Sequence, residues 1–325
     1  MTLRIGTRGS ELALFQADAV AAQLRAKTGL ECETVVIRTS GDTLADASLA
    51  QIGGKRLFVK EIEDALLAGT IDLAVHSSKD MPAVLPDGLR IAGVLPREDA
   101  RDAVILPAGQ VRLKADPTAE DLISRLGNAP RIGTSSVRRT AQLARLFPRA
   151  SFVPIRGNLG TRLRKLDAGE YDALVLATAG LIRLQQRARI SASLPIHACV
   201  PAPGQGIIAV EIRAGDARAA AAVAAVDDAP ARAALDAERA VVVKLGGGCQ
   251  MPIGAHASVD DSSLTLIATV LSLDGARAIR AELHAGAGDA AAAGTAVAED
   301  LLSRGAAAIL SEVQRAHAAV EGIQP

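Results

Sequence analysis

The sequence has few aromatic residues: phenylalanine, tyrosine and tryptophan make up 2% of its 325 residues, and tryptophan is absent. Without aromatic side chains, the successive bases of a nucleic acid have no surface on which to stack. The 36 basic and 36 acidic residues cancel, so no overall positive charge favours a nucleic acid or an anionic membrane. We therefore expect neither partner, and any anion site must be a local cluster of cations.

Cysteine is equally scarce, and the three cysteines, Cys32, Cys199 and Cys249, lie far apart. This odd, scattered set suits a reducing compartment and offers no disulfide framework or zinc-type cluster. The five histidines show no paired spacing, so we expect no metal site. Residues 1–10 lack the apolar segment of a signal peptide, and no run of about 18 uncharged apolar residues predicts a membrane helix. We expect a cytoplasmic protein.

The apolar residues that are present, 49% of the chain, predict large aliphatic cores and more than one domain. Short apolar runs at residues 3–7 and 71–75 alternate with segments of helical spacing such as residues 11–27, which is typical of an α/β fold. The same alternation recurs at residues 131–134 and 171–177, and Ser135 and Ser136 after the first of these runs predict a helix cap. The sequence therefore predicts two α/β units built in the same way.

The order of these patterns also predicts the domain boundaries. A proline- and glycine-rich crossover precedes the apolar run 207–212, which we expect to return to the first sheet. The first domain is then residues 1–99 plus 200–220, and the second is residues 100–199. Residues 221–325 combine alanine-rich helical segments with alternating strands, and predict a smaller α+β third domain. One helix is expected over residues 216–245, where this alanine-rich composition begins.

Cations and hydroxyls follow the expected strand ends in both α/β units. In open parallel sheets, the carboxyl ends of the strands form the ligand crevice. Helices that start there add free N–H groups and a positive dipole end, which favour carboxylate or phosphate. A single arginine on a helix is as readily a solvated or ion-paired side chain, so it is the convergence that favours an anion site. The residues concerned are Arg8, Ser10, Lys79, Asp80, Thr134, Ser136, Arg138, Arg139 and Arg156.

A glycine-rich loop surrounds the last cysteine. Gly246, Gly247 and Gly248 precede Cys249, and the absence of side chains around this thiol would let other groups approach it. The simpler interpretation is a glycine turn beside an ordinary core cysteine.

Five segments carry motifs in a fixed order along the chain: residues 76–80 (HSSKD), 133–139 (GTSSVRR), 156–158 (RGN), 203–206 (PGQG) and 247–250 (GGCQ). In this order they resemble the porphobilinogen deaminase (hydroxymethylbilane synthase) family. The resemblance covers nearly the whole chain and is weakest after residue 254. It implies two α/β domains like those of periplasmic anion-binding proteins around a cleft, with a smaller α+β C-terminal domain.

The resemblance implies a transferase of tetrapyrrole and heme biosynthesis. Such an enzyme carries a dipyrromethane cofactor, here joined to Cys249 by a thioether, and adds four porphobilinogen units to it with loss of ammonia. The product, hydroxymethylbilane, is then released. By the same resemblance Asp80 is the catalytic carboxylate, which assists loss of the amino group and stabilises a cationic intermediate. The protein is expected to be a monomer.

The resemblance also assigns residues that bind the acetate and propionate groups of the pyrrole rings, for which the planar fork of arginine is well suited. Besides Cys249, the expected cofactor-binding residues are Ser77, Lys79, Thr134, Ser136, Arg138, Arg139, Arg162 and Gln205. The expected substrate-binding residues are Arg8, Ser10, Arg156, Arg183, Lys55 and Phe58, the last two in a loop over the cleft. Arg56 departs from the glycine that the family usually has in this loop.

Two other classes of function remain open. A non-enzymatic two-lobed anion-binding protein would use the same arginines, but it would have no use for Cys249 in an added domain. A hydrolase with a cysteine nucleophile is the second alternative, and it lacks a histidine that the sequence places to activate the thiol.

Overall fold

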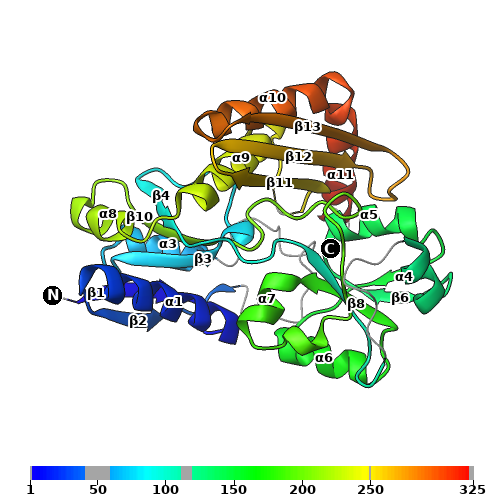
Figure 1. Ribbon diagram of the computed structural model, residues 1–325, viewed down its shortest axis with the longest axis horizontal. Helices are drawn as coiled ribbons and strands as arrows, with labels where there is room; N and C mark the ends of the chain where they lie inside the picture. The colour runs from blue at the N-terminus through cyan, green and yellow to red at the C-terminus, as the bar shows by residue number, and fades with distance from the viewer. Residues whose placement is uncertain (1, 41–58, 111–118, 249, 322–325) are drawn as a thin grey trace.

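The computed structural model describes residues 2–40, 59–110, 119–248 and 250–321. Lys55, Arg56, Phe58 and Cys249 therefore lie outside the described residues. Within the described residues, no helix combines the length and apolarity that a membrane span requires. Figure 1 shows three groups of elements, two of them side by side and the third above them.

The first lobe is a five-stranded sheet with the order β2-β1-β3-β10-β4. Its first three strands are parallel, whereas β10 lies antiparallel between β3 and β4. The expected return of the chain to the first sheet is confirmed. The strands are β1 (Leu3–Thr7), β2 (Cys32–Val36), β3 (Leu73–Ser77), β4 (Leu89–Val94) and β10 (Ile208–Arg213), and the helices are α1 (Glu11–Thr28), α3 (Lys60–Leu67) and α8 (Ala217–Ala224).

The second lobe repeats this arrangement with the order β7-β6-β8-β5-β9. Here β5 is the antiparallel strand, between β8 and β9. The expectation of two α/β units built alike is confirmed. The strands are β5 (Asp102–Ile105), β6 (Arg131–Gly133), β7 (Ser151–Val153), β8 (Ala173–Ala177) and β9 (Ala192–Ser193), and the helices are α4 (Ala119–Leu126), α5 (Val137–Leu146), α6 (Leu159–Asp167) and α7 (Thr178–Arg183).

Helix caps fix the loops that follow the strands. The Ser10 hydroxyl accepts from the N–H of Ala13 at the start of α1, at 3.3 Å. The Ser136 hydroxyl accepts from the N–H of Arg139 at 3.4 Å, which confirms the cap expected for this helix. Because a cap removes one unpaired N–H from the first turn, it determines where each helix starts and therefore where the side chains after the strand point.

The third unit is an α+β layer, at the top of Figure 1. Its three-stranded antiparallel sheet has the order β11-β12-β13 and packs against helices. This arrangement, with the two lobes, confirms the expected fold class. The elements are α9 (Ala229–Leu245), β11 (Ile253–Asp260), β12 (Ser263–Leu271), β13 (Ala278–Gly286), α10 (Ala290–Ser303) and α11 (Ala306–Glu321).

The helix expected over residues 216–245 is in fact two helices. α8 ends at Ala224 and α9 begins at Ala229, after Asp228 has capped it by accepting from the N–H of Ala231 at 2.9 Å. A proline in the first turn of α9, Pro230, fits this start, since proline has no N–H to leave unpaired. α8 packs with the first lobe, and α9 belongs to the third unit.

The third unit contacts both lobes. In the turn between β12 and β13, Gly275 has a φ of +73°, and a Cβ there would lie 2.2 Å from the carbonyl oxygen of Ala141 in α5. Arg145 of the same helix donates to the carbonyl of Gly275 at 2.9 Å. On the other side, Arg239 of α9 donates to the carbonyl of Ala83 in the first lobe at 2.8 Å.

Candidate functional site

A cleft of about 500 Å³ lies where the strand ends of the two lobes face each other. Side chains that follow β1, β3, β7 and β8 line it, as expected for the carboxyl ends of strands in α/β sheets. The predicted residues that line the cleft are Arg8, Ser10, Ser77, Lys79, Asp80, Arg139, Arg156, Arg162 and Arg183.

Asp80 and Lys79 come from a single 3-10 turn, η1 (Ser78–Asp80), directly after β3. The Asp80 side chain is exposed to the cleft, whereas Lys79 is half-buried, with its Nζ 3.5 Å from Oε1 of Gln205. Burial lowers the pKa of Lys79 to about 8, with Asp80 and Asp102 opposing this change. The carboxylate of Asp80 and the cation of Lys79 thus both line the cleft, on neighbouring residues.

The second lobe supplies further desolvated cations. Arg183 donates to the carbonyl of Gly206 at 2.7 Å, and burial lowers the pKa of its guanidinium to about 10. Arg162 donates through Nε to the carbonyl of Gly157 at 2.8 Å, and burial lowers its pKa too. A lowered pKa means that the charged form is short of compensation in the protein alone. The donor set therefore fits a ligand that carries several carboxylates.

Arg138 and Arg139 are both buried and share one carboxylate. Nη1 of Arg138 lies 2.8 Å from Oδ2 of Asp102, and Nη2 of Arg139 lies 2.7 Å from Oδ1. Burial alone would raise the pKa of the Asp102 carboxyl, but the two guanidinium groups outweigh it and hold this pKa well below its usual range. Arg139 lines the cleft, whereas Arg138 is turned away from the cleft lining, and it also donates to the carbonyl of Val200 at 2.7 Å.

Three other predicted residues lie beneath the cleft rather than in its lining. Thr134 is buried, and its hydroxyl accepts from the N–H of Ser136 at 3.3 Å, while Ser136 caps α5. Gln205 is 1% exposed and donates to the carbonyl of Ala100 at 2.7 Å and to Oδ1 of Asp102 at 2.9 Å. In this structure these residues support the lining residues.

Asp102 and Glu238 are central buried residues that sequence reasoning missed. Asp102 is an acidic residue at the head of the otherwise apolar strand β5, and Glu238 lies on the apolar face of α9. Both side chains have no exposed surface. An isolated acidic residue within an apolar pattern was the available signal, since a buried carboxylate requires a partner.

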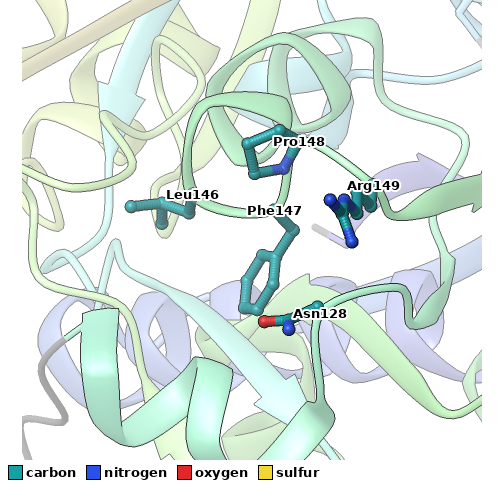
Figure 2. A pocket seen from close by; sticks show the side chains of 5 residues that line it. All are labelled: Asn128, Leu146, Phe147, Pro148 and Arg149. Atoms are coloured by element: carbon teal, nitrogen blue, oxygen red, sulfur yellow. The ribbon is translucent and has the colours of Figure 1, made fainter.

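A second pocket, of about 310 Å³, lies at the end of α5 (Figure 2). Asn128, Leu146, Phe147, Pro148 and Arg149 line it. None of these is a predicted site residue, and the pocket has one cation where the cleft has many. The convergence of charge therefore identifies the cleft as the functional site.

Comparison with known families gives two matches along the chain. The model described as "Porphobilinogen deaminase, dipyromethane cofactor binding domain" matches residues 3–221. A second model, "Porphobilinogen deaminase, C-terminal domain", matches residues 233–303. The chain belongs to the porphobilinogen deaminase family. The family, and with it the expectation of an enzyme, is confirmed.

Named relatives are similar to this chain over nearly its full length. The porphobilinogen deaminase of Moorella thermoacetica is 47% identical over 313 residues, which is 96% of each chain. That of Syntrophotalea carbinolica is 46% identical over 310 residues, 95% of each chain. Among solved structures, immunogenic lipoprotein A from Vibrio vulnificus is 14% identical with a TM-score of 0.42, over 71% of this chain and 96% of its own. The fold assignment rests on the strand orders, not on this remote likeness.

Dipyrromethane is the cofactor of this porphobilinogen deaminase family member. The matched cofactor-binding region, residues 3–221, contains both lobes and every described cation of the cleft. A dipyrromethane carries acetate and propionate groups, and the cleft offers lysine and arginine side chains whose charge burial leaves undercompensated. The residues present therefore fit the cofactor.

Proposed function

We propose that the chain condenses four porphobilinogen molecules head to tail onto its dipyrromethane cofactor and releases ammonia and hydroxymethylbilane. The observation that carries this proposal is the carboxylate of Asp80, exposed directly after β3 in a cleft rich in cations, where Glu11 is the other acidic residue of the lining. Binding of the acidic substrate explains the cations, whereas loss of ammonia leaves a positive charge shared between the methylene carbon and the pyrrole ring, which a nearby carboxylate stabilises further. Membership of the family supports the same reaction.

In each addition the bond between the aminomethyl carbon and nitrogen breaks, and that carbon bonds to a pyrrole carbon, whose proton passes to Asp80 and replaces the one that left with the nitrogen. The cofactor, when bound, supplies the first such pyrrole carbon. Asp80 can hold the proton that moves to the departing nitrogen, and its negative charge then stabilises the positive methylene carbon. Arg156, Arg183 and Arg8 would hold the substrate carboxylates, since guanidinium binds a carboxylate through two parallel hydrogen bonds.

The three parts of the chain would divide this work. Residues 1–99 plus 200–220 supply Asp80, Lys79 and Arg8, and residues 100–199 supply the other arginines of the cleft. Residues 221–325 would hold the cofactor through a thioether at Cys249. From the resemblance of their motifs, we also propose that Lys55 and Phe58 belong to the substrate site, and that the cofactor site includes Ser77, Thr134, Ser136, Arg138, Arg139, Arg162 and Gln205.

The proposed partner is porphobilinogen itself, with neither nucleic acid nor membrane involved. We further propose that the protein is a cytoplasmic monomer. The scattered cysteines and the balanced charge support this setting.

Intact-mass measurement tests the proposal directly. The purified wild-type protein should exceed its sequence mass by one dipyrromethane unit, and Cys249→Ala should lose both the added mass and the activity. Cys32→Ala and Cys199→Ala serve as matched controls and should retain both. Wild-type protein at the unmodified mass that still converts porphobilinogen would overturn the cofactor assignment. Binding of porphobilinogen without release of ammonia would instead favour a non-catalytic anion-binding protein.

A further inference from the structure

Asp102, the first residue of β5, is the point at which several cofactor-site residues meet. Its Oδ2 accepts from Arg138 at 2.8 Å and from the thiol of Cys199 at 3.4 Å. Its Oδ1 accepts from Arg139 Nη2 at 2.7 Å, from Arg139 Nε at 2.9 Å and from the amide of Gln205 at 2.9 Å. Asp102 has no exposed surface and does not line the cleft.

The charges around this carboxylate do not balance. Two guanidinium groups, of Arg138 and Arg139, share the single negative charge of Asp102, so the cluster keeps a net positive charge. One buried N–H of Arg138, at Nε, has no hydrogen-bond partner among the residues that the structure describes. A cluster of this kind holds its cations in place and still attracts a carboxylate, because a buried cation without a partner is costly.

The influence of Asp102 extends to the first lobe through Gln205. The Gln205 amide nitrogen donates to Asp102, while its oxygen lies 3.4 Å from Arg139 and 3.5 Å from Lys79 Nζ. Asp102 and the carbonyl of Ala100, which accepts from the same nitrogen at 2.7 Å, therefore determine the orientation of this amide, since only the nitrogen can donate to them. Its oxygen is then left facing the two cations.

We propose that Asp102 is a positioning residue of the cofactor site, which fixes Arg138 and Arg139 and, through Gln205, Lys79, without itself touching the cofactor. This inference rests on the proposed function. Asp102 takes no direct part in the reaction, because it is buried and lies outside the cleft lining.

The first test is the fraction of protein that carries the cofactor. In Asp102→Asn, intact mass should show a loaded fraction reduced about tenfold or more, because charge-assisted hydrogen bonds that hold both arginines are lost. Asp102→Glu keeps the charge but moves it by one methylene, and should reduce loading severalfold. The matched control, Cys199→Ala, changes a neutral contact to the same carboxylate and should load as the wild type does.

The second test separates positioning from a general loss of fold. In the Cys249→Ala background, calorimetry measures the binding of porphobilinogen against pH. Lys79 faces Asp80, Asp102, Arg138 and Arg139, so removal of the Asp102 charge should move the alkaline loss of binding to lower pH. In Asp102→Glu, the pH at which binding is lost should stay the same. If the role of Asp102 were purely structural, Asp102→Asn would bind more weakly at every pH, but the pH at which binding is lost would not change.

The outcomes are distinguishable from failure of the proposed function. Wild-type protein without the added cofactor mass would overturn both the proposed function and the positioning role of Asp102. A loaded wild type with equally loaded, folded Asp102→Asn, or with a fully loaded Asp102→Glu, would overturn only the positioning role. If Asp102→Asn does not fold, the Asp102→Glu result still decides the question.

Discussion

Arg97 donates to the carboxylate of Glu238 on α9, with its Nη1 2.6 Å from Oε1. Arg97 lies in the first segment that joins the two lobes. Oε2 of Glu238 accepts from the N–H of Gly204 in the second such segment at 2.6 Å, and Oε1 accepts from the N–H of Ala257 in β11 at 2.7 Å. One buried carboxylate thus connects both interlobe segments to the third unit.

Glu238→Gln should lower the thermal unfolding midpoint substantially. Loss of the charge leaves Arg97, whose side chain is 13% exposed, without its counter-ion, at a cost of about 3 to 5 kcal/mol. Asp300→Asn is the matched control, since its pair with Arg304 is exposed and worth about 0.3 to 0.5 kcal/mol. Calorimetric scans in which both variants unfold at the same temperature would contradict the importance of the buried pair.

Arg138→Leu and Arg139→Leu should each yield largely cofactor-free protein. Each charge-assisted hydrogen bond to a carboxylate is worth about 1.5 to 3 kcal/mol. Arg139 lines the cleft and Arg138 does not, so residual turnover in the Arg139 variant should also show a raised KM. Intact mass and steady-state kinetics measure the two effects. The control is Arg131→Leu, whose side chain pairs with Asp172 away from the cleft lining; full loading of both test variants would show that their placement in the cofactor site is wrong.

Asp80→Asn should keep the cofactor and still bind porphobilinogen, yet lose turnover. The amide preserves size but removes the charge that stabilises the positive carbon. At an effective dielectric of about 20, a charge roughly 4 Å away contributes about 4 kcal/mol, and exposure of Asp80 reduces this, so we expect a loss of about 100- to 1000-fold. Single-turnover kinetics with mass detection of enzyme-bound intermediates provide the measurement. Normal elongation in this variant would assign the role to another group.

The affinity for porphobilinogen should fall as the pH rises through about 8. Burial lowers the pKa of Lys79 to about 8, so its charged form, which attracts carboxylates, is present below this pH and lost above it. Lys79→Arg should retain affinity above pH 8, because a guanidinium keeps its proton there. The pH dependence of binding in the Cys249→Ala background measures this, and identical alkaline behaviour of Lys79 and Lys79→Arg proteins would refute it.

Local patterns predicted much of the fold. The bounds of β1 and α1 follow from an apolar run and a helical period, and the cap at Ser136 was readable from the residues alone. The break between α8 and α9 was missed, because a run of alanines has no contrast between its faces from which to read a period.

The sequence predicted many of the residues near the cleft, but not which of them line it and which are buried behind the lining. Strand ends located Asp80 and Arg139 at the cleft, since topology alone places them there. The carboxylate that binds Arg139 is 37 residues away, and Glu238 is 141 residues from Arg97. Such pairings arise from packing between elements, which the periodicity of each segment does not encode. Burial of Arg138 behind the lining was hidden for the same reason.

The position of β10 also determines the order in which a nascent chain can complete its parts. This strand separates β3 from β4 in the first sheet, yet it begins at Ile208, after β9 of the second sheet has ended at Ser193. On the ribosome, all the strands of the second lobe are therefore synthesised before the first lobe receives its last strand, β10. Until β10 is synthesised, the sheet of the N-terminal lobe has unpaired strand edges, which promote aggregation. This lobe is therefore the part of the nascent protein that most needs protection from aggregation.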